Sequence, residues 1–215
     1  MEWIDMLYAE TNELWKENGS DKKGYSIFYS PPVFNPDIMI VGYNPGGGEN
    51  SFDESNASIV PKEHDYFPPN GNYPLARNMR KIFEFAGMTE KLRGSVKFNL
   101  IFFRSRNKKE ITKNKNLIDF CKNETNKIII NLKPKLILAE GIDTYKELLG
   151  ITKGYNEKDQ VFTDKNDKTI HISSTGKTEG GAIKIIGIIH PSGGYGISDD
   201  MLTEIGKNIK AELNN

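Results

Sequence analysis

The chain has 215 residues, of which 37% are apolar and 27% are charged, and its formal net charge at pH 7 is zero. This length and composition are typical of one globular domain with a sizeable core, and they exclude a disordered or a membrane-embedded chain. The zero net charge argues against extensive contact with nucleic-acid phosphates, although the distribution of charge matters more than its sum.

The residue types limit the cofactors that the chain can bind. A single cysteine, Cys121, can form neither an internal disulfide nor a cysteine-rich zinc or iron–sulfur site. The three histidines are far apart in the sequence, so we expect no metal and no cofactor. The acidic N-terminal segment does not resemble a signal peptide, and no apolar run approaches the ~20 residues of a membrane span. We therefore expect a cytoplasmic protein that does not enter a membrane.

The first half of the chain alternates between periodic segments and one long loop. A helix is expected over residues 2–17, and the apolar run 37–41 (DIMIV) predicts a buried strand. Residues 42–74 are rich in Gly, Asn, Pro and Ser and predict a loop, which at such a length is usually functional. A helix is then expected over 75–86, closed by Gly87.

The second half repeats this alternation with shorter elements. Strands are expected at 96–103 (VKFNLIFF), 136–139 (LILA) and 183–189 (IKIIGII). Helices are expected at 117–132, at 144–149 and after Ser198, which can act as an N-cap. The polar stretch 154–179 predicts at most one edge strand, at 169–173.

Short apolar runs separated by helices are typical of a mostly parallel sheet that is covered on both faces. We therefore predict an α/β protein, a three-layer α/β/α domain around a central, mostly parallel four-stranded sheet. One domain covers residues 1–215, with 1–35 as an N-terminal helical extension. Ligands of such sheets bind at the carboxyl ends of the strands, where the segments 42–49, 103–107 and 190–196 should meet.

Two of these segments carry distinctive motifs. GYNPGGGEN (42–50) could be a plain turn or a phosphate cradle. It is neither a Walker loop nor a dinucleotide fingerprint. HPSGGYG (190–196) places a histidine directly after the last strand. The run RSRNKKEITKNK (104–115) holds six Lys or Arg against one Glu, as expected of either a solvated loop or a phosphate contact.

GYNPG after the first strand and HPS after the last strand resemble the two signature motifs of the uracil-DNA glycosylase superfamily. The Asn-Pro-Gly version is similar to that of the mismatch-specific and single-strand-selective branches. NYPLARNMRKIFEFAGMT, KFNLIFFRSRN and PKLILAEG resemble the family segments in between, so the resemblance spans about residues 37–213. The loop from Gly46 to Tyr73 is longer than in the compact mismatch-specific enzymes, and the first ~35 residues have no counterpart.

The resemblance implies a monofunctional hydrolase that flips a base out of DNA and breaks its N-glycosidic bond, as in base-excision repair. Asn44 would orient the attacking water, and His190 would donate a hydrogen bond to the leaving base. The implied base-binding residues are Gly42, Tyr43, Tyr73 and Asn99. Phe52, Tyr66 and Phe67 are alternatives to Tyr73 as the aromatic that stacks on the base.

The resemblance also implies a set of DNA contacts and a monomeric protein with DNA as its partner. The residues in question are Pro45, Gly46, Ser192, Gly193, Gly194, Tyr195, Lys108 and Lys109. Two alternatives remain open at this point. The fold could bind nucleic acid or a nucleotide without catalysis, or it could be an enzyme that acts on a free nucleoside or nucleotide.

Overall fold

In a computed structural model of the chain, the described residues are 2–18, 24–46, 59–105, 110, 114–163, 169–192 and 196–214. The helices are α1 (Glu2–Glu17), α3 (Pro74–Phe85), α4 (Thr89–Arg93), α6 (Lys115–Leu132), α7 (Ile142–Ile151), α8 (Asp199–Asn214) and the short 3-10 helix η1 (Glu179–Gly181). The strands are β1 (Ile38–Gly42), β2 (Val96–Asn99), β3 (Leu136–Glu140), β4 (Tyr155–Thr163), β5 (Thr169–Lys177) and β6 (Lys184–Ile188). Within these ranges, no helix combines the length and the apolar character needed to cross a membrane.

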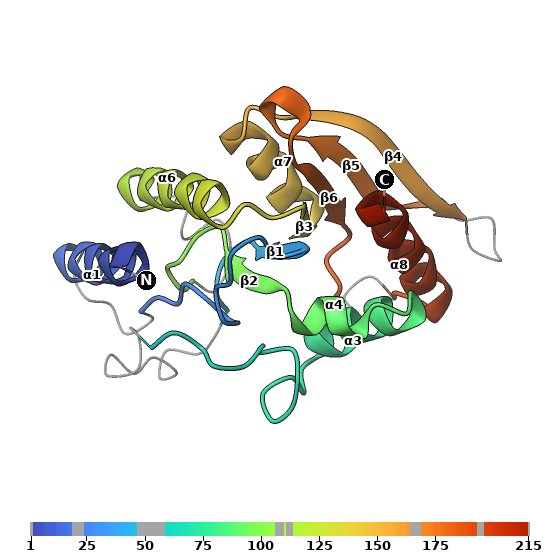
Figure 1. Cartoon of the computed structure of the whole chain (residues 1–215), viewed down its shortest axis with the longest axis horizontal. Coiled ribbons are helices and arrows are strands. Elements are labelled where there is room, and N and C mark those ends of the chain that lie inside the picture. Colours follow the sequence, from blue (N-terminus) through green and yellow to red (C-terminus); the bar gives the residue numbers. More distant parts are fainter. Residues whose placement is uncertain are drawn as a thin grey trace.

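The strands form one mixed sheet with the order β2-β1-β3-β6-β5-β4. Strands β2, β1, β3 and β6 run parallel, whereas β5 and β4 are each antiparallel to their neighbours. The α/β class is confirmed, but the prediction of a four-stranded sheet is wrong, because the sheet has six strands. The antiparallel pair β4 and β5 extends it at one edge (Figure 1).

Strand β4 was not predicted from the sequence because most of its side chains are exposed to solvent. Its large apolar residues are Tyr155 and Val161, which are more than half exposed, and Phe162, which is partly buried against the core. A strand that is mostly exposed has little need for apolar alternation, so its sequence is similar to that of a polar loop. Strand β5 includes the predicted edge strand and is longer at its C-terminal end.

Helices cover both faces of the sheet (Figure 1). Successive side chains of a strand point to opposite faces, so each strand contributes to two cores. Met39 and Val41 of β1 pack with α1, α6 and α7, whereas Ile38 and Ile40 of the same strand pack with α3 and α8. The molecule thus has three layers of helix, sheet and helix.

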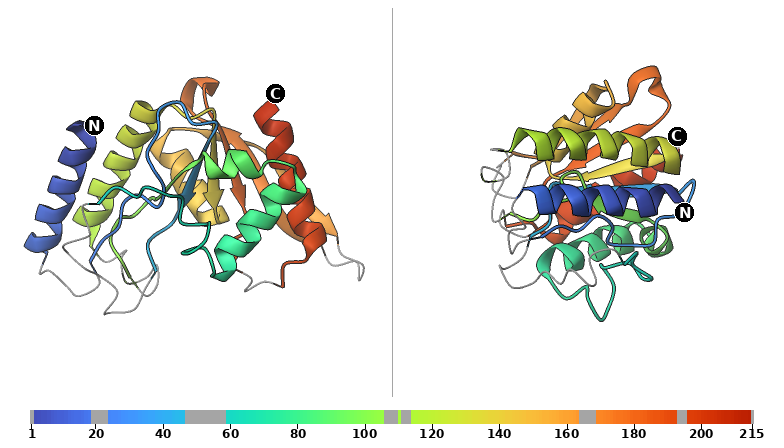
Figure 2. Two further views of the ribbon diagram at one scale, coloured as in Figure 1. Left: turned by 60° about the horizontal axis from the view of Figure 1, so that its bottom comes forward. Right: turned by 90° about the vertical axis from the view of Figure 1, so that its left-hand side faces the viewer.

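The predicted N-terminal helix α1 packs into the first of these cores. Figure 2 shows α1 alongside α6. The ring of Trp15 meets Tyr25 edge-on, and the ring of Tyr8 contacts Phe28. The segment containing Tyr25 and Phe28 forms isolated bridges to the β2 region, so the N-terminal residues extend the core beyond the sheet edge.

The ends of α3 and α8 follow the local sequence. Gly87 adopts a φ of 67° and its N–H donates to Glu84 O at 2.9 Å, while Met88 N–H donates to Phe83 O at 2.7 Å. This is the glycine-terminated helix end that the sequence predicted. Ser198 Oγ accepts the N–H of Met201 at 3.3 Å, so the predicted N-cap of the last helix is confirmed.

Candidate active site

Polar side chains gather at the carboxyl ends of the parallel strands, on one face of the sheet. Ile38 and Ile40 of β1 belong to the core under α3 and α8. Gly42, two residues further, lies on the same face because side chains alternate along a strand. The same alternation places four further side chains on this face: Lys97, Asn99, Glu140 and His190. The α3 and α8 face is therefore the polar one at this edge.

These strand ends surround a cavity of about 600 Å³. Its volume lies within the roughly 300–1,000 Å³ that is typical of ligand sites. Eight of the residues predicted from the sequence line it: Gly42, Tyr43, Asn44, Pro45, Gly46, Tyr73, Asn99 and His190. The other lining residues are Tyr29, Asp65, Leu75, Lys97, Arg104 and Glu140. The loops after β1 and β6, far apart in the chain, thus face one space.

The side chain of Asn44 is held through its amide nitrogen. Nδ2 donates to Ser105 Oγ and to the Pro45 carbonyl, each at 3.0 Å. These two hydrogen bonds fix the orientation of the amide group. Because Nδ2 is engaged, the carbonyl oxygen Oδ1 is the atom that Asn44 can offer to a bound water as an acceptor.

His190 is held by the residues that follow it. Its Nδ1 lies 3.0 Å from Ser192 Oγ, and Asn78 Nδ2 donates to the Pro191 carbonyl at 2.8 Å, which ties this loop to α3. Burial, together with the positive charge of Lys97, lowers the pKa of His190. The ring is therefore neutral at neutral pH. When the Ser192 hydroxyl donates to Nδ1, the ring proton is on Nε2, which can then donate to a ligand.

Because Gly42 has no side chain, Asn99 and Glu140 can occupy the space beside it. The two strands are in register, with Gly42 paired to Asn99. A Cβ at Gly42 would lie 2.2 Å from Asn99 Oδ1 and 3.2 Å from Glu140 Oε2. The first distance is impossible for a real side chain, so only glycine at this position permits the observed arrangement. The Tyr29 hydroxyl also forms a hydrogen bond with the side chain of Asn99.

Tyr73 lies at the cavity, directly before α3, and is half-buried. Its hydroxyl donates to the carboxylate of Asp65, and burial together with this contact raises its pKa. Of the alternative aromatics, Tyr66 is buried in the core and its ring meets Tyr73 edge-on. Phe67 is covered by the guanidinium of Arg93 at 4.1 Å. Tyr73 is thus the aromatic, among the described ones proposed for stacking, that borders the cavity.

A buried ion pair that the sequence analysis missed lies in the cavity wall. Lys97 Nζ is 2.8 Å from Glu140 Oε2, and the two side chains are 5% and 1% exposed. They reach each other across β1, which lies between β2 and β3 in the sheet. The Tyr66 hydroxyl donates to Glu140 Oε1.

Burial lowers the pKa of Lys97 and raises the pKa of Glu140, because it disfavours the charged form of each group. A buried ion pair rarely stabilises a fold relative to apolar residues, and perturbed titratable groups in a cavity are typical of functional sites. The available sequence signal was one lysine inside VKFN and one glutamate closing LILAE.

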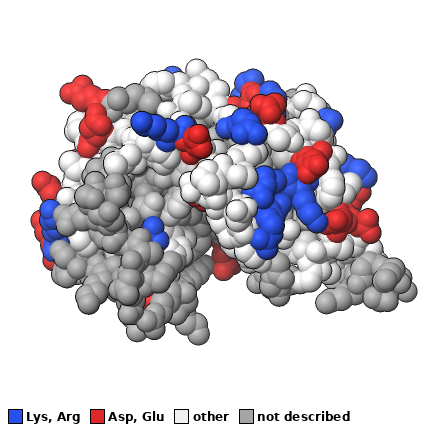
Figure 3. All heavy atoms as spheres, turned by 90° about the horizontal axis from the view of Figure 1, so that it is seen from below, with Lys and Arg blue, Asp and Glu red and all other residues white. Residues whose placement is uncertain are grey.

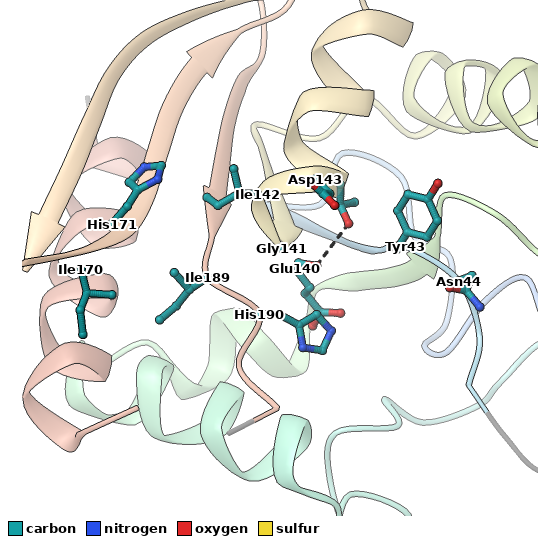
Figure 4. Close-up of a pocket in the computed structure, with 11 residues that line it drawn as sticks. Tyr43, Asn44, Glu140, Gly141, Ile142, Asp143, Ile170, His171, Ile189 and His190 are labelled. Carbon is teal, nitrogen blue, oxygen red and sulfur yellow. Dashed lines mark hydrogen bonds between the residues drawn. The ribbon is translucent and has the colours of Figure 1, made fainter. Parts of the chain in front are cut away.

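A second hollow of about 540 Å³ adjoins the first. Tyr43, Asn44, Glu140 and His190 line both. Figure 4 shows Ile170 and Ile189, together with His171, across the second hollow from Asn44, and most of this hollow's lining is apolar. A ligand beside Asn44 and His190 therefore has a polar space on one side and an apolar space on the other.

Several predicted DNA contacts lie outside the described residues: Gly193, Gly194, Tyr195, Lys108 and Lys109. Phe52, one of the alternatives to Tyr73, also lies outside them. Ser192 is described, is exposed, and contacts His190. Of the residues expected to contact DNA, Pro45, Gly46 and Ser192 thus lie at or beside the cavity.

Positive charge is distributed unevenly on this neutral chain. Figure 3 shows Lys and Arg gathered on the face seen from below, with Asp and Glu beside them. Helix α3, at the bottom of Figure 1, contains Arg77, Arg80 and Lys81 against a single acid, Glu84. Lys81 pairs with Asp199 at 2.8 Å, so part of this charge is neutralised. Within the part of the chain that the structure describes, α3 thus contributes a small basic cluster.

No family model matches the chain, and no curated protein matches it either. Among the described residues, no group of three or more His, Cys, Asp or Glu side chains is arranged to hold a metal ion. A functional assignment therefore depends on the geometry of the cavity and on the motifs that line it.

Proposed function

We propose that the protein is a DNA glycosylase that hydrolyses the N-glycosidic bond of uracil, or of a related damaged or modified base, after the base has been flipped out of DNA. The observation that carries this proposal is that Asn44 and His190 line one cavity together with Asn99. These are the positions for which the motif resemblance implies a water-orienting, a leaving-group and a base-reading residue. A base-excision step in DNA repair is the role that such an activity would serve.

In this proposal, Asn44 positions the attacking water. Its Oδ1 accepts a hydrogen bond from the water, while Ser105 holds Nδ2. An amide is a weak base, which suits a reaction whose transition state has oxocarbenium character and needs little proton abstraction before the bond breaks. The water then adds to the sugar carbon on the side opposite to the departing base, and the proton that it loses is taken up by the base, which leaves as an anion.

His190 stabilises the leaving group. The neutral ring donates from Nε2 to a carbonyl oxygen of the base as negative charge develops there. A single well-placed donor of this kind changes rates by about 10²–10³-fold where it has been measured. In the tautomer that this role requires, Nδ1 accepts a hydrogen bond from the Ser192 hydroxyl.

Base capture involves Tyr73 and Asn99, which line the same cavity. The half-buried ring of Tyr73 stacks on the flipped base, and Asn99 hydrogen-bonds its edge. Extrusion of a base from a duplex takes a few kcal/mol, which such contacts offset.

The direct test is base release from single- and double-stranded oligonucleotides that each carry one uracil or one other damaged or modified base. Alkali cleavage then reveals abasic sites. We expect release by the wild-type protein and a loss of at least 100-fold in Asn44→Ala and in His190→Ala. Asn123→Ala, an exposed amide on α6, is the matched control and should retain full activity.

The other outcomes assign a different function. Binding to these oligonucleotides without release of any base would favour a non-catalytic nucleic-acid-binding protein. Hydrolysis of free nucleosides or nucleotides, with none of the oligonucleotides cleaved, would favour a small-molecule enzyme that uses the same cavity. Release that persists unchanged in both alanine variants would contradict the roles given to Asn44 and His190.

A further inference from the structure

Two acceptor oxygens converge on the cavity floor beside Gly42. The space that a Cβ of Gly42 would fill is bordered by Asn99 Oδ1 at 2.2 Å and by Glu140 Oε2 at 3.2 Å. Both residues line the cavity. The floor at this point is therefore an acceptor pair, which we define as Asn99 Oδ1 and Glu140 Oε2.

Two hydrogen bonds fix the position of the Glu140 carboxylate. Lys97 Nζ donates to Oε2 at 2.8 Å, and the Tyr66 hydroxyl donates to Oε1. Each carboxylate oxygen can accept about two hydrogen bonds. Oε2 thus retains the capacity to accept one more from a ligand, and its position does not depend on that ligand.

Lys97 also offsets the negative charge of Glu140. An isolated carboxylate would repel a base that departs with negative charge. Lys97 lies against Glu140 and is itself 5% exposed, so the pair presents no net charge to the cavity. The acceptor pair can therefore discriminate by hydrogen bonding without opposing bond cleavage.

Acceptor oxygens distinguish the two groups that most nucleobases carry on their rings. An exocyclic amino group has two N–H bonds and can donate one to each oxygen of the acceptor pair. An exocyclic carbonyl has none and would bring a third acceptor against two others. A site built to hydrogen-bond a donor rejects a ligand that lacks it by large factors, because the buried polar groups are then unpaired.

We propose that Glu140, together with Asn99, selects a flipped base that carries an exocyclic amino group over the corresponding base that carries a carbonyl. This specificity rests on the proposed glycosylase function and narrows its substrate. Uracil, whose ring carries carbonyls and no amino group, is then the poorer substrate of the site. Glu140 is a specificity-determining residue, and Lys97 is the residue that positions it.

The test compares bases that carry an amino group with the corresponding bases that carry a carbonyl, in which the adjacent ring nitrogen is also protonated. Three such pairs are cytosine with uracil, 5-methylcytosine with thymine, and adenine with hypoxanthine, each placed once in the same oligonucleotide. The pairs cover different rings and substituents because the apolar hollow beside Glu140 leaves room for them. Base release is measured by mass spectrometry for the full-length protein, and the result is the ratio of rates within each pair.

We expect the amino member to be released at least tenfold faster in every pair that reacts. Glu140→Gln replaces one acceptor by a donor and should lower this ratio at least tenfold. The double variant Lys97→Met, Glu140→Gln keeps the wall neutral and should show the same lowered ratio if the single variant folds poorly. A ratio within one protein is insensitive to loss of folded material, since both members are measured on the same sample.

Two results would overturn the proposal while leaving the glycosylase function intact. The first is faster release of the carbonyl member, and the second is an amino preference that both variants retain. Failure to release any of these six bases or any damaged base used in the direct test would remove the glycosylase function, and the specificity with it.

Discussion

The two faces of the sheet are built from the same strands but end differently. On the face covered by α1, α6 and α7, the strands present Val41 and Ala139 as their last core residues. On the face covered by α3 and α8, Ile40 and Leu138 are followed by Gly42 and Glu140. Because side chains alternate along a strand, a shift of one residue in register would move the polar groups to the other face. The position of the site therefore depends on this alternation.

Substitutions on the two faces of the sheet should also have different effects on stability and on function. The α1, α6 and α7 face is stabilised by apolar burial, so substitutions there should change the free energy of unfolding and little else. The α3 and α8 face holds polar groups whose desolvation must be offset by their partners. Substitutions there should change stability and substrate processing together, and by amounts that depend on which partner is removed.

The largest effect is expected at the buried ion pair. Lys97→Met leaves the Glu140 carboxyl buried without its cationic partner, and loss of one member of such a pair lowers the free energy of unfolding by about 3–5 kcal/mol. The double variant Lys97→Met, Glu140→Gln removes both charges and should recover most of that loss. Urea unfolding followed by circular dichroism measures both values.

The opposite face supplies the control for this experiment. Ile137→Val on β3 removes one buried methylene from the apolar face and should lower the free energy of unfolding by about 1 kcal/mol without affecting base release. If the double variant were no more stable than Lys97→Met alone, the destabilisation would come from packing around Lys97 and not from an unpaired carboxyl group.

The ion pair also marks the limit of what the sequence could predict. The four parallel strands were recognisable because each is a short apolar run, and the carboxyl-edge rule then brought Asn44 and His190 together. Asn99 was implied only by the family resemblance. The Lys97–Glu140 pair requires knowledge that β1 lies between β2 and β3, with Gly42 beside the Glu140 carboxylate. Strand order is not visible in one sequence.

The antiparallel strand β4 could not be predicted for a different reason. It lies at the sheet edge and most of its side chains are exposed. Its pairing with β5 comes from backbone hydrogen bonds, which any residue except proline can form. The sequence therefore carries no apolar pattern that would distinguish this strand from a polar loop.

The second prediction concerns the space at Gly42. Gly42→Ala would place a Cβ 2.2 Å from Asn99 Oδ1, so Asn99 must move, and overpacking of this kind lowers the free energy of unfolding by about 1–3 kcal/mol. Base release should fall at least tenfold because the acceptor pair is displaced. Gly150→Ala on α7, where the Cβ would meet nothing within 4 Å, is the control and should be neutral or slightly stabilising.

A second substitution separates the two effects of Gly42→Ala. Adding Asn99→Gly to Gly42→Ala frees the space and should restore much of the stability, while base release remains low because Asn99 is lost. Recovery of base release in this double variant would show that Asn99 takes no part in reading the base.

The third prediction is a pH dependence of stability from His64, which is buried on the polar face. Its Nδ1 accepts the Tyr66 N–H at 3.2 Å and its Nε2 lies 3.0 Å from Ser95 Oγ. Burial, with the nearby charges of Lys97 and Arg93, lowers the pKa of His64 to about 3. The unfolded chain binds a proton near pH 6.5 and the folded chain does not, so stability falls as pH decreases through this range.

The linkage relation gives a loss of about 2 kcal/mol between pH 7.5 and pH 5 from this residue alone. Urea unfolding at a series of pH values should show the decrease in wild type and a flatter profile in His64→Gln. The comparison isolates His64 from other titrating groups because both proteins share them. Equal slopes in the two proteins would mean that protonation of His64 does not destabilise the fold.

The smallest effect is expected at Tyr73, where the hydroxyl and the ring have separate roles. Tyr73→Phe removes the hydrogen bond to Asp65 and should lower the free energy of unfolding by about 1 kcal/mol. It retains the ring, so base release should change less than threefold. Tyr73→Ala also removes the stacking surface, which contributes about 1–3 kcal/mol per base in nucleic-acid sites, and should reduce base release by tenfold or more. If the phenylalanine variant were as inactive as the alanine variant, the hydroxyl would be the functional group of Tyr73, and the polar face would recognise its ligand without an aromatic stack.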